Sequence, residues 1–343
     1  MKVAIVCDTH FGARNDNELF LDHFLNFFED QFFPYLRENG IDTIIHLGDF
    51  FDRRKYVNVN TLNQVRKRFL SHLDGFKFHC ILGNHDTYYR STNEVNSLKE
   101  ILGDRYPSFI LHEEPATLDL AGLSVALVPW INKKNREDFL NFVKTCKASI
   151  LMGHFEINGY EVIPGLKFRD GLDARLFSRF DSVYSGHFHA KQSKENIHYF
   201  GTPYQITFSD ANLRKGFHVL DTETGKFEFI ENNDRMFHVF VYDENEQLNK
   251  EDFRNKYVKI MVDRRSGRSN NGVDLLIDEL NSLPVANLTV VELEDEKEEN
   301  EEKIDLQKDT LTIISEEIDR MGINNSEKLK KIINELYVES LNI

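Results

Sequence analysis

The sequence has little cysteine and no long uncharged apolar run. Only three of its 343 residues are cysteine, and Cys7, Cys80 and Cys146 lie far apart with no C-x-x-C pair. This pattern is typical of buried thiols in a reducing compartment, and it argues against a closed, cysteine-bound zinc site. Because no apolar stretch could cross a bilayer and no signal peptide is visible, we expect a soluble protein without a membrane span.

Positive charge is also scarce. The chain has 42 lysine and arginine residues against 57 aspartate and glutamate residues, a formal net charge of -15. Nucleic-acid-binding surfaces are normally basic, so this balance argues at first sight against a nucleic acid partner. However, residues 292–305 are almost continuously acidic, and two bound divalent cations would add positive charge where a phosphate must sit. The net charge is therefore a weak objection.

What the sequence does contain is a series of short motifs rich in metal-ligating side chains, each near the end of a strand-like run. In chain order they are Asp8-Thr9-His10, Gly48-Asp49-Phe50-Phe51-Asp52, Gly83-Asn84-His85-Asp86, Gly153-His154 and Gly186-His187-Phe188-His189. Carboxylates, imidazoles and an amide at the carboxyl ends of separate strands converge on one pocket only if those strands lie side by side. The series therefore predicts a two-metal phosphoesterase site on an α/β fold.

The order of these motifs resembles that of the calcineurin-like metallophosphoesterases. Within that superfamily the chain is most similar to the SbcD family of DNA double-strand-break repair nucleases, and in particular to its phage members, the small subunits of recombination endonucleases. Gly201-Thr202-Pro203-Tyr204 and Lys215-Gly216-Phe217 follow the last histidine motif, as they do in that family. The resemblance implies two facing mixed β-sheets flanked by helices, a small α/β capping domain and a C-terminal helical hairpin.

The resemblance also implies the metal ligands. The first metal would be bound by Asp8, His10, Asp49 and His189, and the second by Asp49, Asn84, His154 and His187. Phosphodiester hydrolysis without a covalent intermediate needs hydroxide at neutral pH and stabilisation of charge on the phosphate oxygens. Two divalent ions about 3.5 to 4 Å apart supply both, if Asp49 bridges them. Mixed nitrogen and oxygen ligands favour manganese, with magnesium as the second choice.

Other motif residues are assigned to the surroundings of the metals. His85 follows a ligand and should point toward the phosphate, so we expect it to stabilise the transition state or to protonate the leaving oxygen. Asp52 and Asp86 are expected to orient His85 or a neighbouring histidine. The alternative is that each is a turn or helix-start carboxylate. Glu156 matches the family's form of the fourth motif and is expected to position His154.

Periodicity and composition divide the chain into four segments. Short β-branched runs alternate with helical patterns, such as those over 61–73 and 93–101, until the apolar rhythm stops near Asn232. The predicted segments are 1–232, 233–291, an acidic linker over 292–303 and a helical segment over 304–343. The resemblance implies that the first is the metallophosphoesterase domain, the second a DNA-binding capping domain and the last a partner-binding segment.

The last segment carries an apolar stripe at helical spacing. Its members are Leu311, Ile314, Ile318, Met321, Leu329, Ile332, Leu336 and Tyr337. A two-helix hairpin cannot bury such a stripe on itself alone, so something must cover it. By resemblance the cover is the coiled-coil base of an SbcC-like SMC/ABC ATPase subunit. The alternative is that the hairpin folds back onto this chain's own core.

Basic residues suggest contacts with DNA. Arg53, Arg54 and Lys55 follow the second motif, where they would rim the pocket and contact the DNA backbone. For a second cluster, DNA contact and a solvated loop are equally good interpretations. That cluster comprises Arg264, Arg265 and Arg268.

The first helix is unusually aromatic, on more than one face. It contains Phe20, Phe24, Phe27, Phe28, Phe32 and Phe33. A helix that is apolar all round must be buried on both sides, in a large core or against a second molecule. SbcD-type subunits dimerise through helices near this region, so the resemblance predicts a homodimer within a heterotetramer. The alternative is packing under the neighbouring helix that begins at residue 61.

Together these observations predict a manganese-dependent nuclease subunit of an SbcCD-like DNA end-processing complex. The resemblance implies 3′ to 5′ exonuclease activity on duplex DNA and endonuclease activity on single strands and hairpins, in phage recombination and replication in the bacterial host cytoplasm. One alternative is a calcineurin-like phosphatase or small-molecule phosphodiesterase, which would not need the cap and hairpin. Another is a non-catalytic DNA-end scaffold for the ATPase, which intact ligands at every position disfavour.

Overall fold

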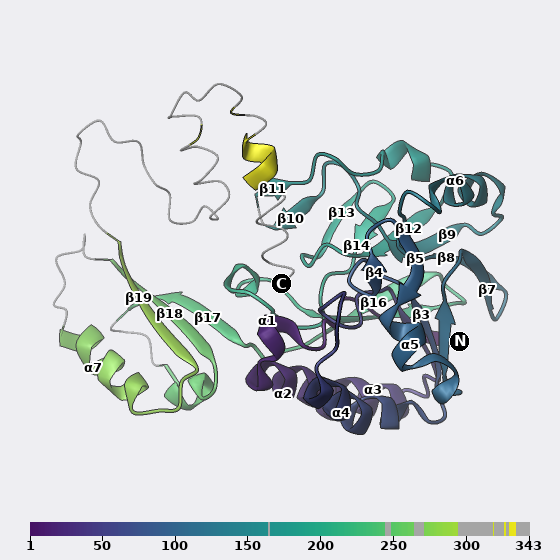
Figure 1. The fold of residues 1–343 in the computed structure, drawn as a ribbon. Helices are drawn as coiled ribbons and strands as arrows, with labels where there is room; N and C mark the ends of the chain where they lie inside the picture. The colour runs from purple at the N-terminus through teal and green to yellow at the C-terminus, as the bar shows by residue number, and fades with distance from the viewer. Residues whose placement is uncertain are drawn as a thin grey trace. The chain divides into compact units, whose positions relative to one another are not determined.

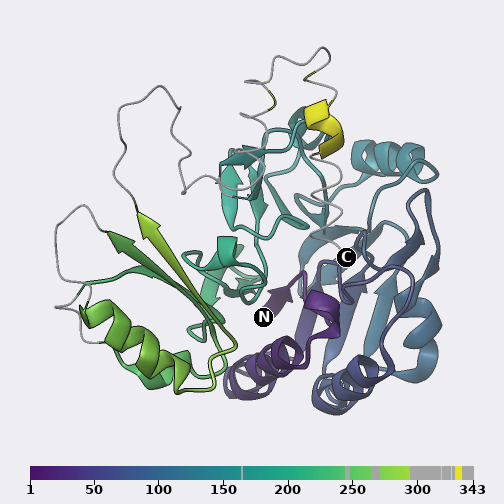
Figure 2. The ribbon, with the colours of Figure 1, turned by 60° about the vertical axis from the view of Figure 1, so that its left-hand side comes forward.

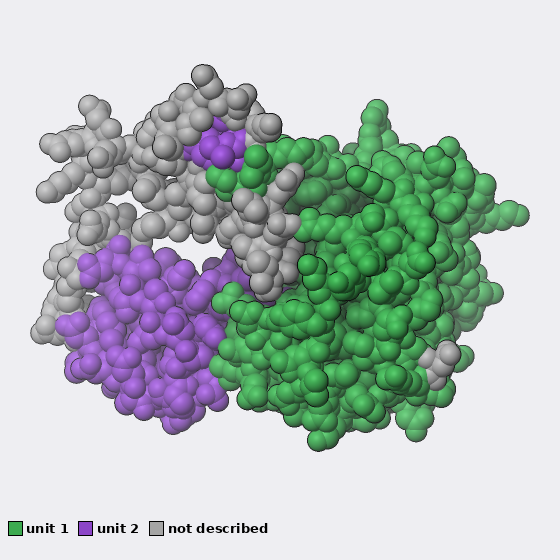
Figure 3. All heavy atoms as spheres, in the orientation of Figure 1, with its two compact units in different colours: residues 1–204, 214–233, 331–343 green, residues 205–213, 234–330 purple. Residues whose placement is uncertain are grey.

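The computed structural model describes residues 1–163, 165–243, 248–263, 271–293, 318, 326 and 329–333. The chain forms two compact units (Figure 3). Unit 1 comprises residues 1–204, 214–233 and 331–343, and unit 2 comprises residues 205–213 and 234–330.

Unit 1 contains two six-stranded mixed sheets, which confirms the predicted fold class. Sheet 1 has the order β16-β15-β1-β2-β3-β6, in which β1, β2, β3 and β6 are parallel and β15 is antiparallel to both its neighbours. Sheet 2 has the order β13-β14-β12-β9-β8-β7, in which only the two edge strands are antiparallel. The bounds are β1 Lys2–Val6, β2 Thr43–His46, β3 Lys77–Ile81, β6 Phe109–His112, β7 Ala116–Leu120, β8 Leu123–Val128, β9 Ile150–His154, β12 Ser182–Gly186, β13 Gln192–Lys194, β14 Ile197–Tyr199, β15 Gly216–Asp221 and β16 Lys226–Glu231.

The central strands are buried on both faces. Every residue of β1 except Lys2 is buried, and β2 and β9 are buried throughout. Strands that are buried along nearly their whole length are typical of parallel sheets that are covered on both sides. Ile5 and Ile45 of sheet 1 share one apolar core with Leu127 and Met152 of sheet 2, so the two sheets face each other.

Helices gather on one side of unit 1, next to sheet 1 (Figure 1). They are α2 Glu18–Phe27, the π-turn η1 Phe28–Phe32, α3 Phe33–Glu38 and α4 Val59–Arg68, which the short 3₁₀ turn η2 Leu70–Leu73 follows. The Asn17 side chain caps α2 by accepting the N–H groups of Leu19 and Phe20. Phe69, which ends α4, lies against Phe78 of β3 with ring centroids 5.7 Å apart, so the helices pack on sheet 1 through aromatic rings.

The six phenylalanines of the first helix are buried inside this single chain, each at most 2% exposed. Phe28 and Phe33 contact Phe69 at 4.7 and 5.4 Å between ring centroids, and Phe24 stacks on Tyr204 at 3.7 Å. The wider π-turn changes the helical register, which helps later rings return to the buried side. The argument from these rings to a dimer is therefore wrong, and packing beside α4 accounts for them. The homodimer stays a prediction from the resemblance.

The helix predicted over 93–101 is wrong in its first half. β4 Thr87–Tyr89 and β5 Thr92–Asn96 form a hairpin, and α5 spans only Ser97–Ile101. The Asn96 side chain accepts the N–H of Lys99 and so fixes the start of the helix. On sheet 2, α6 Arg136–Thr145 packs its apolar face into a second core. Among the described residues, no helix is long and apolar enough to cross a bilayer.

Unit 2 contains a parallel three-stranded sheet, β17-β18-β19, with α7 along one face (Figure 2). The bounds are β17 Phe237–Val241, β18 Tyr257–Asp263, α7 Asn271–Asn281 and β19 Asn287–Leu293. Val258 and Ile260 of the sheet share a core with Leu276 and Leu280 of the helix. Phe208 contacts Phe237 at 4.8 Å between ring centroids, which explains why residues 205–213 belong to this unit.

Candidate metal centre

All the predicted ligands lie at the carboxyl ends of parallel strands. In sheet 1, residues after β1, β2 and β3 supply Asp8, His10, Asp49 and Asn84, and in sheet 2 the ends of β9 and β12 supply His154, His187 and His189. Parallel strands of one sheet place such positions along a common edge. The structure brings these side chains into one cluster at the edge of the two sheets, and we call it the ligand edge.

One group of ligands surrounds His10. Its Nε2 lies 3.1 Å from Nε2 of His189 and 3.7 Å from Oδ2 of Asp49. One ligand atom each from Asp8, His10 and His189 lie within 4.8 Å of one another. Atoms that each bind one ion at about 2.1 Å are separated by about 3 Å, so this spacing suits neighbouring ligands of a single cation.

A second group surrounds His154. Its Nε2 lies 3.3 Å from Oδ2 of Asp49, 2.9 Å from Oδ1 of Asn84 and 3.2 Å from Nδ1 of His187. His187 Nδ1 is also 2.9 Å from the same Asn84 oxygen. The second predicted set is therefore gathered as closely as the first.

Asp49 stands between the two groups. Its Oδ2 is the atom that faces both His10 and His154. Its Oδ1 accepts the backbone N–H of His85 at 2.8 Å, which fixes the orientation of the carboxylate. This is the position that a bridging ligand requires.

Asp52 acts on two histidines through different atoms. Its Oδ1 lies 3.2 Å from Nδ1 of His10, on the opposite side of the ring from the other ligands. Its backbone carbonyl is hydrogen-bonded to Nδ1 of His85, whose ring stands edge-on to that of His10 with centroids 4.9 Å apart. His85 therefore adjoins the first group, and one ligand atom each from His10, Asp52 and His85 also lie within 4.8 Å of one another.

The Asp86 carboxylate binds backbone N–H groups, whereas the sequence predicts that it orients a histidine side chain. Its carboxylate accepts N–H groups from Gly83 at 2.8 Å, Asp49 at 2.9 Å and Phe50 at 3.0 Å. Burial and the charge of Asp49 raise the pKa of Asp86 to about 7, while the backbone donors oppose the shift. Asp86 thus joins the second and third motifs into one unit.

The backbone of the ligand edge is strained. Asp8, His10, Asp49 and His187 have φ values of 54°, 42°, 57° and 85°, a region that non-glycine residues rarely adopt. Such conformations persist where surrounding structure enforces them, and they cluster at functional sites. A Cβ atom on Gly83 would collide with Asp49, so the glycine of the third motif permits this close approach.

The charges of the ligand edge call for a cation. Burial lowers the pKa of His10, but its contacts with Asp52 and Asp49 raise it to about 9. Burial also lowers the pKa of His154, and its contact with Asp49 raises that pKa to about 9 as well. Oδ2 of Asp8 is buried and has no hydrogen-bond partner in the described part of the chain. Leaving a buried carboxylate oxygen unpaired is costly, and a metal ion would pair it. The residues present therefore fit divalent cations.

Glu156 is placed differently from the prediction. Its Oε1 lies 3.2 Å from Nε2 of His187, so it orients His187 and not His154. Two further residues near the ligand edge were not assigned from the sequence. Trp130 lies beside both His154 and His187, and Nζ of Lys215 donates to the carbonyl of His189 at 2.8 Å. The Lys215-Gly216-Phe217 motif was a signal for the lysine, whereas nothing in the sequence marked the tryptophan.

The first basic cluster, Arg53, Arg54 and Lys55, makes some of its contacts within the protein. Arg53 pairs with Asp16 at 3.4 Å and lies over the ring of Tyr56 at 4.9 Å. Arg54 is half-buried, and its charge helps to lower the pKa of a neighbouring glutamate, while Lys55 is exposed. The members of the second cluster, Arg264, Arg265 and Arg268, lie outside the described residues. DNA contact stays a prediction for both clusters.

Most of the predicted partner-binding stripe also lies outside the described residues. This holds for Leu311, Ile314, Met321, Leu336 and Tyr337, and for the linker beyond Leu293. Of the others, Ile318 is 4% exposed, Leu329 is half-buried and Ile332 is 43% exposed. Lys331 pairs with Asp170 of unit 1 at 3.0 Å. The role of this segment in binding a partner stays a prediction.

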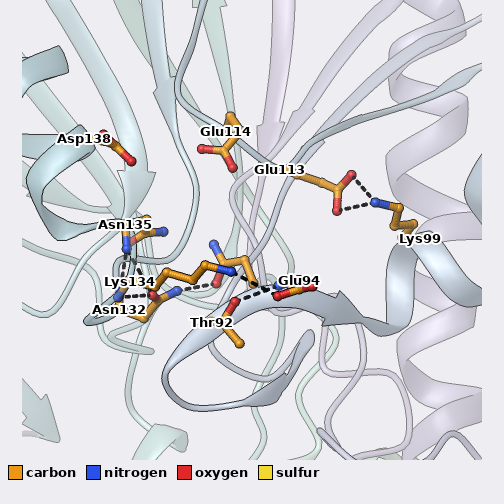
Figure 4. A pocket seen from close by; sticks show the side chains of 10 residues that line it. Thr92, Glu94, Lys99, Glu113, Glu114, Asn132, Lys134, Asn135 and Asp138 are labelled. Atoms are coloured by element: carbon orange, nitrogen blue, oxygen red, sulfur yellow. Dashed lines mark hydrogen bonds and ion pairs between the residues drawn. The ribbon is translucent and has the colours of Figure 1, made fainter.

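A cavity of about 340 Å³ lies beside β5 and the start of α6, apart from the predicted ligands (Figure 4). Lys134 pairs with Glu94 at 3.0 Å and Lys99 with Glu113 at 3.1 Å along its walls. Its remaining charged lining residues, Glu114 and Asp138, are acidic. An excess of carboxylates makes this cavity a poor site for phosphate.

Comparisons with known proteins show the family of the chain. The family model described as calcineurin-like phosphoesterase matches residues 1–191. Exonuclease subunit 1 of Enterobacteria phage T4 is 32% identical over 346 residues, covering 99% of each chain. The SbcD component of the SbcCD nuclease of Staphylococcus epidermidis is 25% identical over 276 residues, covering 70% of this chain and 69% of its own. A solved archaeal phosphodiesterase aligns over 68% of this chain and 100% of its own at 16% identity, with a TM-score of only 0.36.

The protein belongs to the calcineurin-like phosphoesterase family, since the family model spans more than half of the 343 residues. Its similarity to the phage subunit continues well beyond residue 191, through unit 2 and toward the C-terminus.

Proposed function

We propose that the protein is the nuclease subunit of a DNA end-processing complex and hydrolyses phosphodiester bonds at the ligand edge. One observation carries this proposal. Two groups of ligands meet at Oδ2 of Asp49, in a chain that aligns over 99% of its length with an exonuclease subunit. A simple phosphatase would give no reason for similarity to continue beyond the family domain.

The residues divide the work as follows. Asp8, His10, Asp49 and His189 would hold one divalent cation, and Asp49, Asn84, His154 and His187 a second. Bound there, the cations would supply positive charge for the phosphate oxygens and a nucleophile at neutral pH. Manganese is preferred over magnesium because imidazoles make up much of the ligand set. His85 adjoins the first group and is our candidate for contacting the phosphate or the leaving oxygen.

The partners are inferred in the same way. Both relatives are named as subunits, which supports an SbcC-like ATPase as the second component and DNA as the substrate, in the bacterial cytoplasm. The 304–343 segment is the candidate for binding the ATPase. Deleting residues 305–343 should abolish co-purification with the ATPase and leave metal-dependent cleavage intact. Retained binding would favour the fold-back alternative.

A duplex labelled at the 5′ end tests activity and direction together. With manganese, the protein should shorten the labelled strand stepwise from its 3′ end, and more strongly with the ATPase and ATP. An Asp49→Asn protein purified in parallel controls for contaminating nucleases. Immediate release of the label would show that degradation starts at the 5′ end, which would contradict the predicted direction. Intact DNA with rapid hydrolysis of p-nitrophenyl phosphate esters would indicate a phosphatase, and no hydrolysis by the metal-loaded protein would indicate a scaffold.

A further inference from the structure

Trp130 is the only tryptophan of the sequence, and it lies at the ligand edge without offering a ligand atom. It follows β8, which pairs in parallel with β9 and places Val128 opposite Gly153. The Trp130 ring lies 5.6 Å from that of His187 at an interplanar angle of 37°, and 5.9 Å from that of His154 at 73°. The indole therefore forms a wall beside the second group of ligands.

The backbone of Trp130 is fixed on both sides. Its N–H donates to the carbonyl of Leu82 at 2.7 Å, just before the third motif. Its carbonyl accepts the side-chain amides of Asn93 at 2.9 Å and Asn135 at 3.0 Å. Asn135 is in turn held by Asn132, as Figure 4 shows. The loop thus fixes the tryptophan relative to the ligands of both sheets.

The side chain itself is only half-buried. A ring that merely filled space behind the imidazoles would be expected to be buried, as the phenylalanines next to sheet 1 are. The indole N–H makes no hydrogen bond with any described residue. A fixed, partly exposed aromatic surface beside a phosphate site is the arrangement that proteins use to stack nucleobases.

We propose that Trp130 positions the substrate by stacking on the base of the nucleotide whose phosphate enters the ligand edge. The inference rests on the proposed nuclease function and adds what the enzyme recognises, which is an unpaired nucleobase next to the scissile bond. Every base has a π face, so this contact tolerates any sequence. It requires the terminal base to leave its pair before cleavage, and it fails where the base is absent.

Abasic substrates test the contact. Single-stranded oligonucleotides are compared with matched oligonucleotides that lack the base on the nucleotide being cleaved, using wild-type protein, Trp130→Ala and Trp130→Phe. Removal of a base-stacking ring should lower kcat/KM on normal DNA about 5- to 100-fold. The phenylalanine variant should retain most of the activity. On abasic DNA the wild type should be slowed by a similar factor, and Trp130→Ala should cleave both substrates about equally, because the two changes remove the same contact.

Two measurements separate stacking from a structural role. If Trp130 only supports the histidines, Trp130→Ala should weaken manganese binding in calorimetry and slow normal and abasic DNA by the same factor, which would overturn the proposal. Because Trp130 is the only tryptophan, its fluorescence reports on this site alone. Normal oligonucleotides should quench it in calcium or EDTA, and abasic ones much less. If the wild-type protein cleaves neither substrate, the proposed nuclease function is wrong. If it cleaves normal and abasic DNA equally well, only the proposed role of Trp130 is wrong.

Discussion

The ligand edge and the aromatic core next to sheet 1 are both buried parts of unit 1, yet they are built on opposite principles. The aromatic core, around Phe33 and Phe69, consists mainly of phenylalanine rings in mutual contact, and the buried Tyr204 hydroxyl among them donates to the carbonyl of Thr9. The ligand edge contains buried carboxylates, non-glycine residues at positive φ and an Asp8 oxygen that has no hydrogen-bond partner among the described residues. One region is arranged for packing, and the other keeps features that cost free energy unless a cation is bound.

This difference predicts that mutations in the two regions separate function from stability. Substitutions at the ligand edge should abolish metal binding or turnover in a protein that still folds. Substitutions in the aromatic core should lower the free energy of unfolding while the folded fraction remains active.

The largest effect is expected from Asp49→Asn, which removes the charge between the two ligand groups. Loss of several kcal/mol of charge stabilisation corresponds to a fall in kcat of about a thousandfold or more. Manganese at about 100 times its Kd should raise the unfolding free energy of the wild type by about 2.7 kcal/mol for each occupied site, and this gain should disappear in the variant.

Asp22→Asn is the matched control, because Asp22 is an exposed carboxylate on α2 that pairs with Arg68. It should change neither DNA cleavage nor the metal-dependent shift in thermal unfolding. Full metal stabilisation in Asp49→Asn would contradict the bridging role.

His85→Gln tests whether the ligand edge contains a group that acts on the substrate alone. His85 lies beside the first group but is held by the Asp52 carbonyl. Loss of a general acid or phosphate contact should lower kcat about 10² to 10⁴-fold. Calorimetry should still find two manganese ions bound. A variant that binds both metals and cleaves at the normal rate would remove His85 from the mechanism.

The sequence indicated which side chains gather at the ligand edge because each of them adjoins a strand end, where local sequence and topology together determine position. It could not predict which ligand a distant carboxylate meets. Glu156 is two residues from His154 in sequence, yet its carboxylate contacts His187. The sequence did not predict Trp130 as a site residue, because an apolar residue after a strand does not by itself indicate a binding or catalytic role.

The aromatic core was recognised but misinterpreted. A regular 3.6-residue period places its phenylalanines on several faces, and the π-turn over Phe28–Phe32 changes that period. The helix over 93–101 was overextended for a local reason, since Asn96 acts as its cap. Arg53 was predicted to face DNA from its position alone, whereas its contact with Asp16 depends on the tertiary fold. The fold class thus followed from the motif order and the resemblance, whereas the errors came partly from local features, the π-turn and the Asn96 cap, and partly from contacts between distant segments.

Phe33→Ala should weaken the aromatic core without touching the ligands. Truncating a fully buried phenylalanine costs about 3 to 5 kcal/mol of unfolding free energy. Phe33→Leu keeps most of the volume and should cost less than about 1.5 kcal/mol. Urea denaturation measures both. Cleavage per folded molecule should stay within about twofold of the wild type, and a large loss of turnover in the stable leucine variant would show that the two regions are coupled.

Asp52→Asn should have the smallest effect and shows how finely the ligand edge is tuned. Asp52 faces His10 Nδ1 at 3.2 Å, on the side away from the other ligands, so it orients the ring and increases its basicity. Loss of such a partner typically weakens metal affinity 10- to 100-fold. Calorimetry should show one weakened manganese site and one unchanged site, because the second group, around His154, has its own partners. Saturating manganese should then restore most of the cleavage rate. If both sites weakened equally, the two groups would form one cooperative unit, and the division at Asp49 would have to be abandoned.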